Sequence, residues 1–134
     1  MKIKGASFDA TTKRNQFMAD DGVKLIKPGN KYEGAQGVTY NAGVSRGTAG
    51  AQKVCMNILP MPPGVRSKSH IHKGIETIAY MLEGECTLFH GYQLENQTLI
   101  KQGEQIFIPD SVPHAPYNLG CDPCIWIVVT DTPN

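Results

Sequence analysis

Glycine and proline interrupt this sequence about every eight to twelve positions, and short runs of β-branched and aromatic residues lie between them. There are 14 glycines and 9 prolines among the 134 residues. Both residue types favour turns, so this spacing is typical of a sandwich or barrel of short strands. No segment has the sustained period of about 3.6 residues that marks an amphipathic helix. The sequence therefore predicts an all-β fold with little helix.

Eight segments have the composition and length of strands. They are Val38 to Asn41, Gln52 to Leu59, Thr77 to Leu82, Cys86 to Phe89, Gln93 to Ile100, Gln105 to Ile108, His114 to Asn118 and Ile125 to Thr130. In the second of them, Val54, Met56 and Ile58 alternate with Lys53, Cys55 and Asn57. Such alternation indicates a strand with one apolar face and one face in water.

The last predicted strand is apolar on both faces, from Ile125 to Val129. A strand of this kind must be covered on both sides, and the barrel interior covers only one. The polar segment of residues 1–35 or a second copy of the chain could cover the other. We interpret residues 1–35 as an N-terminal arm that packs on the barrel or on a partner chain, and residues 36–134 as the barrel domain. We expect a homodimer.

Charge and hydropathy exclude several classes of partner. Lys and Arg number 13 against 12 Asp and Glu, and they are scattered, so there is no basic stripe for a nucleic acid. The longest apolar runs are far shorter than the roughly 20 residues of a membrane helix. The start of the sequence is positively charged but lacks a following apolar stretch and a small-residue cleavage site, so we expect no signal peptide. We expect no nucleic-acid or membrane partner, and a cytoplasmic location.

The four cysteines are Cys55, Cys86, Cys121 and Cys124. In a chain without an export signal we expect free thiols rather than a disulfide framework. Cys121 and Cys124 have the spacing of a redox or zinc motif, but no second pair accompanies them and they precede a strand rather than a strand-to-helix unit. We interpret them as part of a loop.

The segment from Gly64 to Glu76 carries the strongest chemical signal. Residues i and i+2 of an extended strand point the same way, so His70 and His72 would present two imidazoles on one face, about 7 Å apart along the chain. Glu76 follows after a glycine that permits a turn back toward the same centre. Two imidazoles and a carboxylate suit a divalent first-row metal ion.

A second segment adds a third histidine. Gly103 leads into a short predicted strand, Pro109 bounds the turn that ends it, and His114 opens the next strand. With Gly64, His70, His72 and Glu76 as one motif, and Gly103, Pro109, His114 and Asn118 as a second, the chain resembles the cupin superfamily over roughly residues 50–130. The resemblance implies a small single-domain cupin, with the double-stranded β-helix fold, a jelly-roll-like antiparallel barrel. It also implies that His70, His72, Glu76 and His114 are the metal ligands.

Two positions depart from the family pattern. Seven residues separate Glu76 from Gly84 where the family commonly has six, which indicates a bulge beside Glu76. Ser111 stands where the second motif usually has glycine; we interpret this change as confined to a turn.

The expected cofactor is one divalent transition metal ion: iron, manganese, nickel, cobalt or zinc. Three imidazoles and one carboxylate leave two positions of a six-coordinate ion open, where a substrate or dioxygen can bind. No cysteine lies within either motif, unlike the usual closed structural zinc site. His90 lies outside both motifs and is interpreted as a surface histidine.

The positions of four residues relative to the motifs suggest candidates for a substrate pocket. Arg66 and Lys68 precede His70 at two-residue steps, so a regular strand would point both into the metal cavity, where they would favour an anionic substrate. An exposed loop after Pro62-Pro63-Gly64 is the alternative. Tyr80 and Phe107 could line the pocket, or belong to the core or rim.

Two functions compete. The first is a metalloenzyme acting on a small organic molecule, a carboxylate or sugar acid for example, with dioxygenase-type or isomerase- or lyase-type chemistry. The second is a barrel that binds or senses a small ligand without turnover. A purely structural barrel is disfavoured, because three motif histidines converging on one point are a poor way to build a core.

Overall fold

The computed structural model describes residues 21–134. Its strands are β1 (Lys31–Glu33), β2 (Thr39–Val44), β3 (Cys55–Met61), β4 (Thr77–Glu83), β5 (Glu85–His90), β6 (Asn96–Lys101), β7 (Gln105–Ile108), β8 (His114–Tyr117) and β9 (Cys124–Thr130). The helix in the described part is a single turn, α2 (Arg46–Ala49). Each of the eight predicted strands corresponds to one of β2 to β9, so the all-β prediction is confirmed. β1 and α2 were not predicted.

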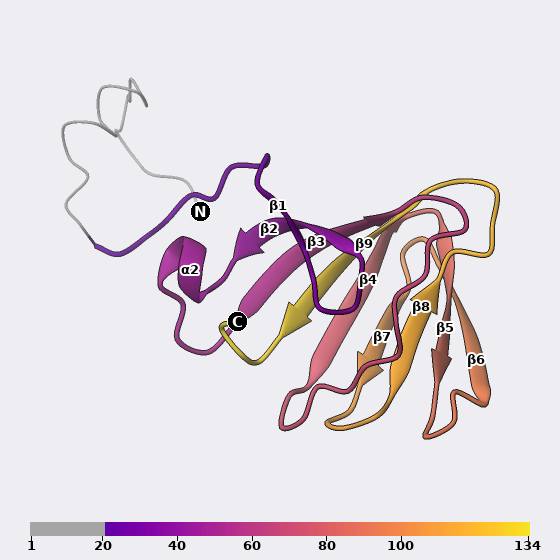
Figure 1. Ribbon diagram of the computed structural model, residues 1–134. Coiled ribbons are helices and arrows are strands. Elements are labelled where there is room, and N and C mark those ends of the chain that lie inside the picture. Colours follow the sequence, from indigo (N-terminus) through magenta and orange to yellow (C-terminus); the bar gives the residue numbers. More distant parts are fainter. Residues whose placement is uncertain (1–20) are drawn as a thin grey trace, which may run out of the picture.

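The strands form two antiparallel sheets (Figure 1). The larger has the order β1-β2-β3-β9-β4-β7 and the smaller the order β6-β5-β8. Side chains of both sheets meet in one core, with Leu59, Met81 and Trp126 from the larger sheet and Leu88 and Ile100 from the smaller. The interior between the sheets is therefore the place where inward-pointing side chains from distant parts of the sequence come together.

The segment between β3 and β4 runs beside β8 without becoming a regular strand. Ser67 N donates to Pro116 O (3.0 Å), and Asn118 N donates to Val65 O (3.0 Å). His70 and His114 exchange both of their backbone hydrogen bonds, each 3.1 Å long. The smaller sheet is thus extended by a loosely paired edge, and this edge carries the first histidine motif.

Alternation in β3 is the reverse of what its apolar pattern suggests. Cys55 and Leu59 are buried in the core, whereas Met56 is 41% exposed on the outer face. The outward-pointing residues of the neighbouring strands are apolar too. Together they form what we call the outer apolar face: Met56, Ile58, Ile78, Tyr80, Leu82, Phe107, Ile125, Ile127 and Val129. The prediction that β9 is apolar on both sides extends to β3, β4 and β7.

The homodimer stays a prediction, now focused on the outer apolar face. We expect light scattering at micromolar concentration to give about twice the 14.6 kDa chain mass, because a specific interface of about 1,600 Å² persists at that dilution. Ile78→Lys, near the centre of this face, should give monomers. Leu99→Lys is the matched control, since Leu99 is equally exposed (50% against 48%) but lies on the other sheet. A wild-type mass of one chain would contradict the prediction.

The predicted N-terminal arm is described only from residue 21 onward. Its strand β1 pairs with β2 at the edge of the larger sheet, with Tyr32 stacked on Tyr40 at 5.2 Å between ring centroids. The boundary at residue 35 stays a prediction, and residues 1–20 lie outside the described part. None of the described helices is long and apolar enough to cross a membrane. All four cysteines are free thiols. Cys121 lies in the loop before β9 as predicted, whereas Cys124 is not a loop residue but the buried first residue of β9.

Candidate metal site

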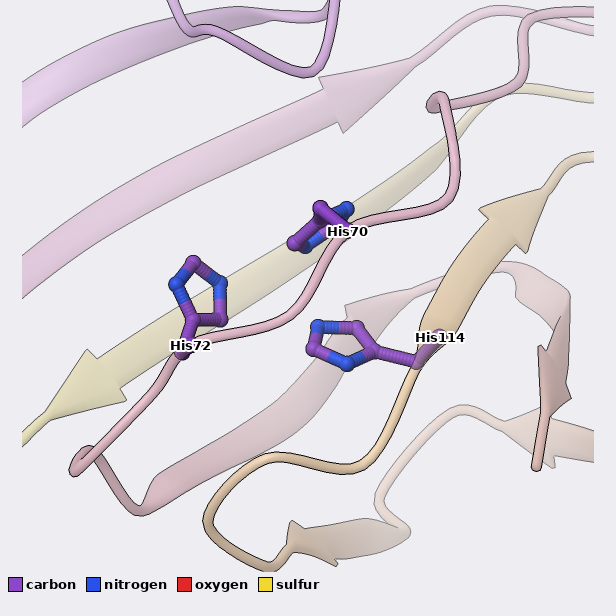
Figure 2. Close-up of side chains that lie close together, drawn as sticks. All are labelled: His70, His72 and His114. Atoms are coloured by element: carbon purple, nitrogen blue, oxygen red, sulfur yellow. The ribbon is translucent and has the colours of Figure 1, made fainter. Parts of the chain in front are cut away.

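Three histidines converge at one end of the barrel interior (Figure 2). His70 and His72 come from the loop between β3 and β4, and His114 comes from the first position of β8. One donor nitrogen from each ring lies within 4.8 Å of the others. Nitrogen ligands bind a zinc-like ion at about 2.1 Å, so only small ring adjustments separate this arrangement from a coordinated one. The prediction that the three histidines come together is confirmed.

Backbone carbonyls fix the orientation of two of the rings. His70 Nδ1 donates to Lys68 O (2.9 Å) and His114 Nδ1 donates to Val112 O (2.9 Å). A carbonyl oxygen only accepts, so each Nδ1 carries the proton and each Nε2 keeps its lone pair. Metal-binding histidines are commonly oriented in this way. The donor atoms therefore suit a metal ion.

Burial keeps the rings neutral, as a metal ligand must be. It lowers the pKa of His70 from 6.5 to about 4; the hydrogen bond to Lys68 O opposes this shift, and His114 and His72 add to it. Burial is also the main cause that lowers the pKa of His72 and of His114. At neutral pH all three lone pairs are available without loss of a proton.

These shifts predict acid sensitivity of the metal-free protein. Below pH 6.5 the unfolded chain takes up protons on these histidines that the folded protein does not, so the free energy of unfolding should fall between pH 6.5 and about 4. Allowing for solvent screening of partly exposed rings, we expect a loss of about 1–2 kcal/mol from pH 7 to pH 5. Urea denaturation in EDTA measures it. His70→Gln should reduce the pH dependence, and equal stability at the two pH values would contradict the account.

The rings border a cavity of about 50 Å³. Most of its wall is apolar, contributed by strands of both sheets: Leu59, Ala79, Leu88, Ile106, Ile108, Pro116, Trp126 and Val128, with Tyr40 and Thr77 as further neighbours. The space takes a water molecule or a ligand group of a few atoms. Polar groups concentrated at one point of an apolar wall are typical of small-molecule sites.

Glu76 is not part of the histidine group. Its side chain is exposed, while its backbone N donates to Asp131 Oδ1 (2.9 Å) and its backbone O accepts from Asp131 N (3.3 Å). The pairing of β4 with β9 is irregular between Met81 and Glu83, so the irregularity expected beside Glu76 lies further along β4. Whether Glu76 is a ligand stays a prediction.

Thr77 is the residue of this site that the sequence argument missed. It is 3% exposed, lines the cavity with the three histidines, and its Oγ1 has no hydrogen-bond partner. The signal was present in the spacing: position 77 is separated from Gly84 by six intervening residues and from His72 by four.

The four predicted pocket residues lie away from the histidine cavity. Arg66 and Lys68 are exposed and line a separate pocket of about 470 Å³ beside β8. Their side chains do not point into the cavity as that of His70 does, because this segment is an irregular edge and not a regular strand. Ser67, which lies between them in the sequence, is the buried residue here. Tyr80 and Phe107 are 37% and 55% exposed and belong to the outer apolar face. His90 lies outside the histidine group, with Nε2 2.9 Å from Thr98 Oγ1.

The turn before His114 supports His72. Ser111 has a φ of 65°, the left-handed conformation that explains why glycine is usual there, and its N–H donates to His72 O (3.2 Å). Asp110 Oδ1 accepts from Ser111 Oγ and from Gly74 N, both at 2.6 Å, and these bonds lower the pKa of Asp110. The turn therefore does more than connect β7 to β8, because it holds the backbone on both sides of Lys73.

The fold and the site together define a small antiparallel β-barrel protein with a three-histidine group that can hold a metal ion. The family model of the cupin domain matches residues 57–130, more than half of the chain. The chain therefore belongs to the cupin family, and its fold is the double-stranded β-helix. No curated protein matches the sequence.

Solved structures agree on the fold. A predicted oxalate decarboxylase from Thermotoga maritima has 22% identity and a TM-score of 0.66, covering 80% of this chain and 93% of that one. The polyketide cyclase RemF from Streptomyces resistomycificus has 23% identity and a TM-score of 0.65, covering 81% and 78%. A protein with a double-stranded β-helix domain from Klebsiella pneumoniae has 18% identity and a TM-score of 0.63, covering 86% and 87%. At these identities the likeness concerns the fold alone.

Proposed function

We propose that this cupin is a metal-dependent enzyme that acts on a small organic molecule. The observation that carries the proposal is the convergence of three neutral imidazoles, from two separate segments, on one end of an apolar cavity. His70, His72 and His114 would hold one divalent ion. Bound there, the ion would act as a Lewis acid on an oxygen-bearing substrate or would bring dioxygen beside it.

Few protein ligands leave room for a substrate. A structural site is usually closed by four protein ligands, whereas three imidazoles leave at least one position of the ion free. The neighbouring cavity is of a size to admit a ligand group at that position. These features favour a catalytic or ligand-binding centre over a structural one.

The class of reaction depends on which metal ion the site holds. Similar structures include a protein described as a predicted oxalate decarboxylase, one described as a polyketide cyclase, and one described as a DMSP lyase (22% identity, TM-score 0.54, covering 60% of this chain and 39% of that chain). One fold therefore accompanies different chemistries. We propose a lyase- or isomerase-type reaction if the ion is zinc, and dioxygenase-type chemistry if it is iron. The cytoplasm stays the predicted compartment.

The second candidate is a barrel that binds a ligand without converting it. It is favoured by the absence of a carboxylate or an amine among the described residues that line the cavity, where Tyr40 is the one titratable side chain besides the histidines. In that case metal and cavity hold a metabolite as a sensor or carrier would.

One experiment separates the candidates. Anaerobically purified protein is analysed for bound metal, reloaded with that metal, and incubated with a panel of small hydroxy acids, keto acids and sugar acids while NMR follows each compound. Conversion that disappears in EDTA and in His72→Ala supports the enzyme. Ligand signals that broaden without conversion support binding alone, and oxygen uptake during conversion identifies dioxygenase chemistry. A protein that binds no divalent metal contradicts both candidates.

A further inference from the structure

A hydroxyl group, not a carboxylate, occupies the inner position next to the three histidines. Thr77 is 3% exposed and lines their cavity, and its Oγ1 has no hydrogen-bond partner in the described part of the protein. Buried hydroxyls are normally paired, because leaving one unpaired costs the free energy of its desolvation. Trp126 Nε1 is the other buried polar side-chain atom without a partner among the described residues, and Trp126 lines the same cavity. Unpaired donors in the wall of a candidate metal centre are available to a bound ligand.

The strand register fixes Thr77 in this position. It lies opposite Ile108 of β7 on one side and Thr130 of β9 on the other. Thr77, Ala79 and Met81 form the inward face of β4. Turning Glu76 inward by a register slip would move Ala79 and Met81 out of the core at the same time. The sheet therefore holds a threonine, and not the preceding glutamate, beside the histidines.

Charge determines what such a centre selects. Three neutral imidazoles leave the two positive charges of a divalent ion uncompensated, whereas a carboxylate ligand would cancel one of them. In an apolar cavity this excess charge acts through a low dielectric and attracts an anion strongly. The apolar wall formed by Leu59, Leu88 and Val128 suits the carbon chain of that anion, and the cavity of about 50 Å³ limits it to a short one.

We propose that the three-histidine centre binds a short-chain monocarboxylate and that Thr77 Oγ1 donates a hydrogen bond to its carboxylate. This inference rests on the proposed function, since it needs the metal ion at the three histidines. It assigns the substrate class to the metal and Thr77, and it gives Glu76, Arg66 and Lys68 no role in the cavity.

The test uses the full-length protein loaded with Co²⁺, whose visible absorption reports changes in its ligands. Acetate, propionate and neutral acetamide are titrated separately. We expect both carboxylates to bind and acetamide to bind at least about tenfold more weakly, because it lacks the charge. Thr77→Val should weaken acetate about tenfold while cobalt content stays at the wild-type level, and Thr77→Ser should restore binding because it keeps the hydroxyl.

Two controls make the result specific. Thr87→Val removes a hydroxyl from the outer face of β5 and should leave acetate binding unchanged. Glu76→Gln should leave both cobalt and acetate affinity within about twofold of wild type. Thr77→Val also removes an unpaired group from the interior, so it should fold, which circular dichroism checks.

The outcomes separate this inference from the proposed function. Wild-type protein that binds no cobalt overturns the metal site, and the anion site with it. Cobalt binding with equal acetate affinity in wild type and Thr77→Val overturns the role of Thr77 alone. Acetamide that binds as well as acetate overturns the anion preference, and a large loss of cobalt in Glu76→Gln shows that the glutamate is a ligand after all.

Discussion

Replacing His72 with alanine should lower the affinity for a divalent ion by at least about 100-fold, because one of three nitrogen ligands is lost. Removing only a group that supports a metal ligand already lowers the affinity by about 10- to 100-fold, so the loss of a ligand itself should cost at least as much. His72 is the best of the three to replace. Its ring makes no hydrogen bond within the described residues, whereas those of His70 and His114 are bonded to backbone carbonyls. The variant should therefore fold normally.

Metal per chain is measured by inductively coupled plasma mass spectrometry after dialysis against a weak chelator. His90→Ala is the matched control, since His90 lies near the site in the sheet, opposite His114, but outside the histidine group. It should retain the wild-type metal content. Full occupancy in a folded His72→Ala protein would refute the assignment of His72.

Replacing Asn118 with alanine should destabilise the protein by about 3 kcal/mol. Asn118 is completely buried, and its Nδ2 donates to Met61 O (2.8 Å) and to Asp122 O (2.9 Å) while its Oδ1 accepts from Gly120 N (3.0 Å). Its backbone also bonds to Val65 and Gly64. The substitution leaves buried carbonyl groups without partners and opens a cavity, and both effects add to the cost.

Urea denaturation of the metal-free proteins measures this difference. Asn96→Ala is the control, because Asn96 is an exposed strand residue and its replacement should change the free energy of unfolding by less than about 0.5 kcal/mol. A similar small change for Asn118→Ala would show that the bonds of this amide do not hold the first histidine motif against the end of β3.

Much of the fold could be predicted because turns and strands alternate locally. Positions of β7 agree residue for residue with the predicted strand, and those of β9 differ by one residue. The convergence of His70, His72 and His114 followed from two motifs whose spacing fits one metal centre. Edge strand β1 was missed because its three residues are all exposed, so the sequence carries no apolar alternation there.

The side of a strand that points to the core was harder to predict than the position of the strand, because it depends on what covers each side of the sheet. In β3 the more apolar set, with Met56, points outward, so alternation alone selects the wrong inner face. The same ambiguity left Tyr80 open between the pocket and the core or rim, whereas its side chain belongs to the outer apolar face. For Arg66 and Lys68, the structure has a loosely paired edge and not the regular strand that would point both side chains into the metal cavity, so it agrees with the alternative of an exposed segment.

The spacing between Glu76 and Gly84 shows how one residue changes a site. Glu76 satisfies the motif by residue type and stays a predicted ligand, whereas the pleat of β4 directs the next residue, Thr77, to the inward face. Sequence patterns report residue types and spacing, but only the register of β4 between β7 and β9 determines which side chain enters the cavity.

The central claim, one metal ion held by three histidines, is tested most directly by crystals of protein purified without added metal or chelator. Diffraction data collected on both sides of the absorption edge of the metal found by elemental analysis locate that ion. We predict one anomalous peak per chain, about 2.0–2.2 Å from a ring nitrogen of each of His70, His72 and His114. A peak bound by other residues, or no peak in crystals of metal-containing protein, would contradict the account.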